Sequence, residues 1–192
     1  MKGRLAILAT MCVAVVLNAC GDPTNLRATA FTTVDTLSVF ALTGTPPSYP
    51  SGVSIVAGQA VRVDGFASFD VALDIDASGR AVVYPVKLIV SSPGGSRPVG
   101  LQKVASGFEA VLEAPRTGYG NDASVVVAPG ETVVIQAVHN GGGDICQYAL
   151  SPYLYAKIAV DSVSLASRTL YLRMGVDPNC GFRSFAAGVP TG

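Results

Sequence analysis

Hydrophobic and polar residues alternate in short runs along most of the chain after residue 28, and Gly, Pro, Asn, Asp and Ser separate the runs. Alternation with a period of two is the pattern of a β-strand with one buried face. In residues 168–176 it puts Leu170, Leu172, Met174 and Val176 on one face. In residues 108–113 it separates Phe108, Ala110 and Leu112 from Glu109, Val111 and Glu113, and predicts a strand that meets the strand 99–105 near Ser106 and Gly107.

Two longer hairpins are expected from the same reasoning. Residues 66–76 and 80–90 flank the turn Ala77-Ser78-Gly79, and residues 153–163 and 168–176 flank a second turn. The segment 153–166 is the best helix candidate, but its β-branched and aromatic content favours a strand. About ten short strands with turns every ~8–12 residues predict an all-β, antiparallel β-sandwich, Ig-like or similar, with a small barrel as the alternative.

The N-terminal residues 1–19 have the three parts of an export signal. Lys2 and Arg4 precede an apolar run from Leu5 to Leu17, and a small residue precedes Cys20. A membrane-spanning helix needs about 20 apolar residues, so this run is too short to be one. The tetrad Leu17-Asn18-Ala19-Cys20 resembles the lipobox of bacterial lipoprotein precursors, although Asn18 is a less usual residue at its position.

The resemblance implies a diacylglycerol thioether on Cys20, cleavage before Cys20, and acylation of the new amino group by a fatty acid such as palmitate. It implies a lipid-anchored protein of the bacterial cell envelope. Gly21 stands where Asp favours retention in the inner membrane of enterobacteria, so an outer-membrane location, periplasmic or surface-facing, is expected. Residues 20–27 would then be a lipidated tether and residues 28–192 a single β-rich domain. An ordinary signal peptide with an incidental cysteine is the alternative.

Composition limits the partners and the redox chemistry. Thirteen basic and 13 acidic residues balance, and no basic patch is visible, so nucleic acid is a poor partner. Of the four cysteines, Cys12 lies in the signal and Cys20 takes the lipid. Cys146 and Cys180 are expected to form a disulfide, since disulfides persist in exported proteins. A metal site is the alternative, but neither a CxxC spacing nor neighbouring histidines support it.

One motif resembles the opening of a calcium loop. Asp74, Asp76 and Ser78 occupy alternate positions before Gly79, and Asp70 lies on the same predicted strand face. Pro85 stands where the bidentate Glu of an EF-hand would be. The alternative is an ordinary hairpin turn in which Asp and Ser side chains bind local backbone amides. Calcium is the only cofactor that the sequence suggests.

Catalytic signals are weak. His139 is the only histidine, and it is expected at a strand end facing solvent. Asp144 could form half of a triad with it, but no nucleophile motif is present. Glu109 and Glu113 have a spacing that suits glycosidases, yet the chain has no Trp to stack on a sugar. Both are expected to be solvated.

Three tyrosines near the expected disulfide, Tyr148, Tyr153 and Tyr155, are candidate recognition residues, with core packing as the alternative. These observations together predict a non-catalytic binding or accessory domain that is held at the membrane by lipid and serves another envelope protein. A small-ligand, glycan or calcium-dependent binding module is the alternative. The inference from fold to task is by analogy.

Overall fold

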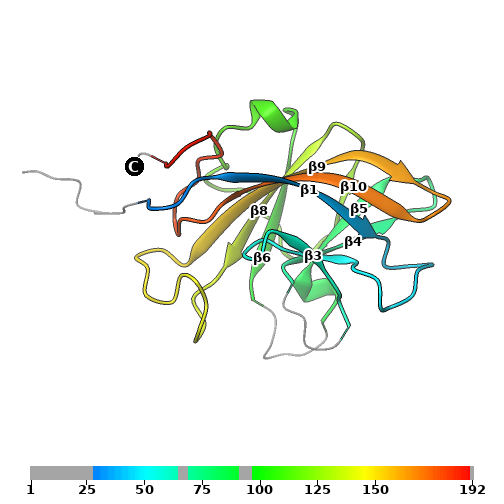
Figure 1. The fold of residues 1–192 in the computed structure, drawn as a ribbon, viewed down its shortest axis with the longest axis horizontal. Helices are drawn as coiled ribbons and strands as arrows, with labels where there is room; N and C mark the ends of the chain where they lie inside the picture. Colours follow the sequence, from blue (N-terminus) through cyan, green and yellow to red (C-terminus); the bar gives the residue numbers. More distant parts are fainter. Residues whose placement is uncertain (1–27, 65–68, 91–96, 191–192) are drawn as a thin grey trace, which may run out of the picture.

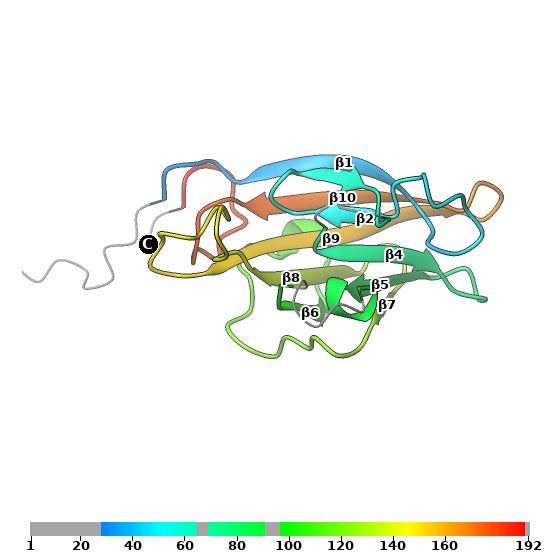
Figure 2. The ribbon, with the colours of Figure 1, turned by 90° about the horizontal axis from the view of Figure 1, so that it is seen from below.

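The computed structural model describes residues 28–64, 69–90 and 97–190, and within them the protein is a β-sandwich of two antiparallel five-stranded sheets. The two sheets pack face to face, and their hairpins project from both ends (Figures 1 and 2). The predicted signal segment, Cys20 and the predicted tether lie outside the described residues. The predicted all-β sandwich of about ten strands is confirmed.

The first sheet has the strand order β1-β10-β9-β8-β6. Its strands are β1 (Thr33–Phe40), β6 (Val99–Val104), β8 (Thr132–Val138), β9 (Tyr153–Ser164) and β10 (Thr169–Asp177). The hairpin of β9 and β10 confirms the strand prediction for residues 153–166. Its register shifts beside Tyr171 and Leu172, which leaves Asp161 unpaired in β9 as a bulge.

The second sheet has the order β3-β2-β4-β5-β7. Its strands are β2 (Gly52–Ser54), β3 (Gln59–Val61), β4 (Val71–Ile75), β5 (Ala81–Pro85) and β7 (Val125–Val127). β4 and β5 form the expected hairpin, although it is shorter than the alternation suggested because β5 ends at Pro85 and runs into the 3₁₀ turn η1 (Val86–Leu88). Proline has no N–H to continue the ladder.

One apolar core fills the space between the sheets. The predicted face of β10 is fully inside it, and the facing sheet contributes Val53, Val71, Leu73 and Val83. Side chains of Val, Leu, Ile and Met supply most of its volume, and each buried one stabilises the fold by about 1.5–3 kcal/mol. The core therefore holds two sheets that share few backbone hydrogen bonds.

The strand prediction for residues 108–113 was wrong. Phe108–Ala110 forms the 3₁₀ turn η2, and β6 pairs with β8 instead. The reason is a second, smaller core on the outer face of the first sheet, where Val111, Val134, Tyr155 and Phe185 are buried together. The chain after β6, residues 105–114, crosses this face as a covering segment. Its buried residues Val111 and Ala114 pack against the sheet beneath them and do not pair with a neighbouring strand.

Candidate functional site

The two ends of the sandwich carry different polar and apolar groups. The disulfide end consists of residues 28–32, 139–152 and 177–190, which lie together on the left of Figures 1 and 2. The Arg168 end consists of residues 41–51, 76–80 and 164–168, which lie on the right. Loops that are carried by a rigid scaffold are the usual location of binding residues, so both ends are candidate sites.

The loop 139–152 is fixed at its neck. Cys146 is disulfide-bonded to Cys180, with their Cα atoms 5.7 Å apart, which confirms the predicted pair. The N–H of His139 donates to the carbonyl of Pro152, and the N–H of Cys146 donates to the carbonyl of His139, both at 2.8 Å. The loop therefore projects from the sheet as a compact unit with a covalent tie to the chain after β10.

The outer part of this loop is apolar and exposed. Tyr148 is 92% exposed, Leu150 75% and Ile145 50%. Asp144 is the only charged residue between positions 140 and 152. Single exposed apolar residues are ordinary on protein surfaces, but three on one short loop with a single charged residue are unusual and indicate a contact surface.

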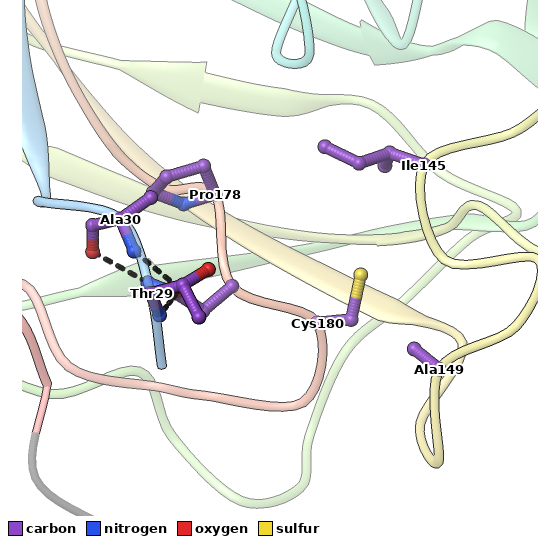
Figure 3. Close-up of a pocket in the computed structure, with 7 residues that line it drawn as sticks. Thr29, Ala30, Ile145, Ala149, Pro178 and Cys180 are labelled. Atoms are coloured by element: carbon purple, nitrogen blue, oxygen red, sulfur yellow. Dashed lines mark hydrogen bonds between the residues drawn. The ribbon is translucent and has the colours of Figure 1, made fainter. Parts of the chain in front are cut away.

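The first described residues, which follow the predicted tether, join the domain at the same end. The N–H groups of Thr29 and Ala30 donate to Oδ1 of Asn179 at 2.8 and 3.0 Å, and Nδ2 of Asn179 donates to the Ala30 carbonyl at 2.9 Å. Asn179 is next to the disulfide residue Cys180. A pocket of about 330 Å³ lies here (Figure 3), lined by Thr29, Ala30, Ile145, Ala149, Pro178, Asn179 and Cys180.

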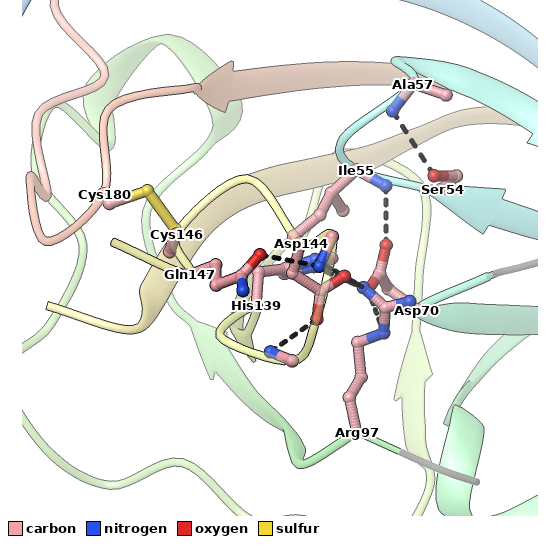
Figure 4. Close-up of polar contacts among 12 residues, drawn as sticks. Ser54, Ile55, Ala57, Asp70, Arg97, His139, Asp144, Cys146, Gln147 and Cys180 are labelled. Atoms are coloured by element: carbon pink, nitrogen blue, oxygen red, sulfur yellow. Dashed lines mark hydrogen bonds and ion pairs between the residues drawn. A yellow bond between two sulfur atoms is a disulfide. The ribbon is translucent and has the colours of Figure 1, made fainter. Parts of the chain in front are cut away.

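A buried polar network lies at the base of the loop (Figure 4). Nε2 of His139 is 3.0 Å from Oδ1 of Asp70, which precedes β4 in the other sheet, and each residue is 1% exposed. Oδ2 of Asp70 accepts the Ile55 N–H at 2.8 Å. The Arg97 guanidinium hydrogen bonds to Nδ1 of His139 and lies 3.8 Å from Asp70 and 3.7 Å from Asp144.

The network corrects the expectation that His139 faces solvent. A guanidinium only donates hydrogen bonds, so Nδ1 of His139 accepts and Nε2 carries the proton that it donates to Asp70. Both ring nitrogens are therefore engaged. No Ser, Thr or Cys side chain among the described residues hydrogen bonds to His139, and Asp144 is 4.0 Å from Nδ1. Asp70 was missed as the partner because it is 69 residues distant in sequence.

The Arg168 end is tied together by one guanidinium. Arg168 lies in the turn between β9 and β10, and its Nε donates to the Thr43 carbonyl at 2.6 Å. Its Nη2 donates to Oδ1 of Asp74 and to the Ile75 carbonyl, both at 3.1 Å. Arg168 is also the only non-glycine among the described residues with a positive φ, at 50°. The Arg168 side chain thus joins loops of both sheets. The backbone of Arg168 is held in the left-handed region of φ and ψ, which residues with a Cβ rarely adopt.

The candidate calcium residues all lie at this end, and each carboxylate already has protein donors. Asp74 accepts from Thr43, Ile75 and Arg168. Oδ1 of Asp76 accepts the N–H groups of Ser78 and Arg80 at 2.9 Å. These hydrogen bonds, with that from the Arg80 backbone the largest, lower the pKa of Asp76. Ser78 contributes its backbone N–H, and Gly79 has a φ of 78°. This is the geometry of an ordinary Asp turn.

Asp70 is far from these residues, in the His139 network. Within the described residues no group of three or more His, Cys, Asp or Glu side chains is placed to hold a metal ion.

The three candidate tyrosines separate. Tyr148 is almost fully exposed and Tyr153 is partly exposed, whereas Tyr155 is only 5% exposed. The Tyr155 hydroxyl accepts a hydrogen bond from Nε2 of Gln136 at 2.9 Å, and its ring packs in the smaller core. Tyr155 has a packing role, which leaves Tyr148 and Tyr153 as surface candidates.

The two candidate glutamates lie in the covering segment and are paired with arginines. Glu109 lies 2.7 Å from Nη1 of Arg173, and Glu113 is ion-paired with Arg183. Their carboxylates lie at the surface, as expected.

Two buried ionisable residues were not singled out in the sequence. Nζ of Lys157 donates to the carbonyls of Phe108 and Val111 at 2.7 and 2.9 Å and lies 4.2 Å from the centre of the Phe108 ring. Burial lowers its pKa. A lysine inside the apolar run 153–160 was the available signal. Asp177 is fully buried, its Oδ2 has no hydrogen-bond partner among the described residues, and burial raises its pKa.

Comparison with protein-family models, curated proteins and solved structures found no match to this chain. In the described part of the chain, no helix is long and apolar enough to cross a bilayer.

Proposed function

We propose that the protein is a lipid-anchored binding or accessory domain of the bacterial cell envelope, held through Cys20, which presents its Arg168 end to a protein partner. Its proposed location is the outer membrane, because the sequence has a lipobox and has Gly21, not Asp, after Cys20. The positions of the two ends support the proposal most strongly. The chain that follows Cys20 joins the domain at the disulfide end, and the Arg168 end lies on the opposite side (Figure 2).

The Arg168 end has the properties of a preformed contact surface. Three loops from both sheets are linked through Arg168, Thr43 and Asp74, so little freedom remains to be lost on binding. Leu165 is 62% exposed there. Tyr49 in the Pro-rich loop is partly exposed, and its ring packs against that of Phe40 in a tilted arrangement, with ring centres 4.6 Å apart. Rigid aromatic and aliphatic side chains are the usual anchors of protein interfaces.

A binding role is favoured over a catalytic one by the state of His139. General acid–base catalysis needs an imidazole nitrogen within reach of a substrate proton. Here one ring nitrogen faces Arg97 and the other faces Asp70, and the ring is buried. The buried network supports the loop neck and joins the sheets, which is a structural task.

The test is a mild crosslink in native membranes followed by affinity purification and intact-mass measurement. The wild-type protein is expected to start at Cys20, to carry acyl chains, and to recover a stoichiometric protein partner. Cys20→Ser should lose the acyl mass. The double variant Tyr49→Ala/Leu165→Asp should remain lipidated and lose the partner.

Leu112→Asp is the matched control, because Leu112 is 59% exposed on the covering segment and lies outside the Arg168 end. It should keep lipid and partner. An unmodified Cys20 in the wild type would overturn the anchor. Full recovery of the partner with Tyr49→Ala/Leu165→Asp would overturn the assignment of the binding surface.

A further inference from the structure

We propose that the loop 139–152 is a second membrane contact, in which Ile145, Tyr148 and Leu150 insert into the interfacial layer of the bilayer that holds the lipid anchor. This inference rests on the proposed lipidation of Cys20. Beyond the lipid anchor, it assigns a membrane-facing surface to the folded domain itself.

The loop and the N-terminal end of the described chain are attached to adjacent residues of the domain. The N–H groups of Thr29 and Ala30 are bound to Asn179, and the adjacent Cys180 is covalently joined to Cys146 in the loop. Eight residue steps separate Cys20 from Ala28, a reach of at most ~25–30 Å when fully extended. The loop is fixed to the same point of the domain that the tether holds near the membrane, so it is among the parts nearest to the lipid.

The side chains of the loop suit the interfacial layer of a bilayer. Tyrosine is enriched at the membrane–water interface because its ring is apolar and its hydroxyl stays hydrated, and aliphatic side chains gain by leaving water. The loop carries no Lys, Arg or Glu. Its only charge, Asp144, accepts the Gly141 N–H at 3.0 Å and lies 3.7 Å from the Arg97 guanidinium. The outer residues of the loop therefore approach lipid without a charge that must be desolvated.

The backbone of the loop is held in place before any membrane contact. The disulfide and the hydrogen bonds of the loop neck hold the backbone before binding, so insertion orders only side chains. The opposite end provides a contrast within the same molecule, because Leu165 has similar exposure there and sits on the end that faces away from the tether.

Tryptophan fluorescence tests this directly, because the chain contains no Trp. Tyr148→Trp and, as the matched control, Leu165→Trp each give a protein with a single tryptophan, which can be excited apart from the tyrosines. Each lipidated full-length variant is purified from membranes and reconstituted in vesicles of phosphatidylethanolamine and phosphatidylglycerol. Brominated phospholipids serve as quenchers that act only on fluorophores in contact with acyl chains.

The expected result is a blue-shifted emission at position 148 that the brominated lipid quenches, and a water-like, unquenched emission at position 165. Adding Ile145→Asp and Leu150→Asp to Tyr148→Trp should abolish the quenching while the melting temperature stays unchanged, because both side chains are exposed. Water-like emission at position 148 in a protein that still co-sediments with the vesicles would overturn the membrane contact and leave the lipid anchor intact. Lack of acyl mass on Cys20 would instead overturn the proposed function.

Discussion

The disulfide end and the Arg168 end solve the same problem, holding loops in place, by different means. The disulfide end uses a covalent bond and a buried network that spans the sheets from Asp70 to His139. The Arg168 end uses a guanidinium with several acceptors, and its side chain is 28% exposed. Removing one partner of a buried polar pair lowers the free energy of unfolding strongly, whereas the loss is smaller for more exposed pairs, which water screens. The two ends should therefore respond to mutation with different magnitudes.

The largest effect is expected at the buried network. Asp70→Ala removes the acceptors of the His139 imidazole and of the Ile55 N–H, and should lower the free energy of unfolding by about 3–5 kcal/mol. Urea unfolding followed by circular dichroism measures it. Asp161→Ala is the control, since its pair with Arg173 is exposed and should contribute about 0–1 kcal/mol. Equal losses in the two variants would show that the network is not structural.

Loss of the disulfide should come next. Cys146→Ser/Cys180→Ser opens a connection between residues 34 positions apart, and should cost about 3–4 kcal/mol by the chain-entropy model. The same unfolding measurement, with and without reductant, checks it. Reductant should lower the stability of the wild type only; if it also lowers that of the double variant, reduction is acting elsewhere.

At the Arg168 end, Arg168→Ala should cost about 2 kcal/mol, because it removes hydrogen bonds to a carboxylate and two carbonyls. Arg168→Gly removes the same bonds but relieves the positive φ, and should be about 1 kcal/mol more stable than the alanine variant. Thermal melts of the pair separate side-chain contacts from backbone strain. An alanine variant as stable as the glycine variant would contradict the strained backbone.

Asp177 should make stability depend on pH. Its pKa is raised by burial, so the folded state binds its proton more tightly than the unfolded state does. The stabilisation from this group is present at low pH and lost as the pH rises through the raised pKa. Asp177→Asn should therefore melt at a higher temperature than wild type at neutral pH, and the difference should shrink as the pH falls towards 4. A gap that widens on acidification would reverse the sign.

Calcium should have the smallest effect. The carboxylates of Asp74 and Asp76 are already bonded to protein donors, so an ion would have to displace Arg168 or the turn amides. Millimolar calcium should leave the melting temperature of the wild type unchanged, with EDTA as the control. A rise that Asp76→Asn abolishes would restore the calcium-dependent binding module as the function.

The sequence was most informative where one physical rule acts alone. Alternation at residues 168–176 predicted the inner face of β10, and the two cysteines left outside the predicted export signal and lipobox predicted the disulfide. It was least informative where distant segments meet. The partner of His139 comes from the opposite sheet, and Phe108 turns away from strand geometry to cover Lys157. Neither relation leaves a local pattern, because each depends on what the fold brings together.

Photo-crosslinking in native membranes tests the proposed roles of the two ends, with one photoreactive side chain at position 148 or at position 165 of the otherwise unchanged protein. We expect position 148 to crosslink to phospholipid and position 165 to crosslink to a protein. Crosslinks from position 148 to protein and from position 165 to phospholipid would contradict this expectation, because the domain would then face the membrane with the opposite end.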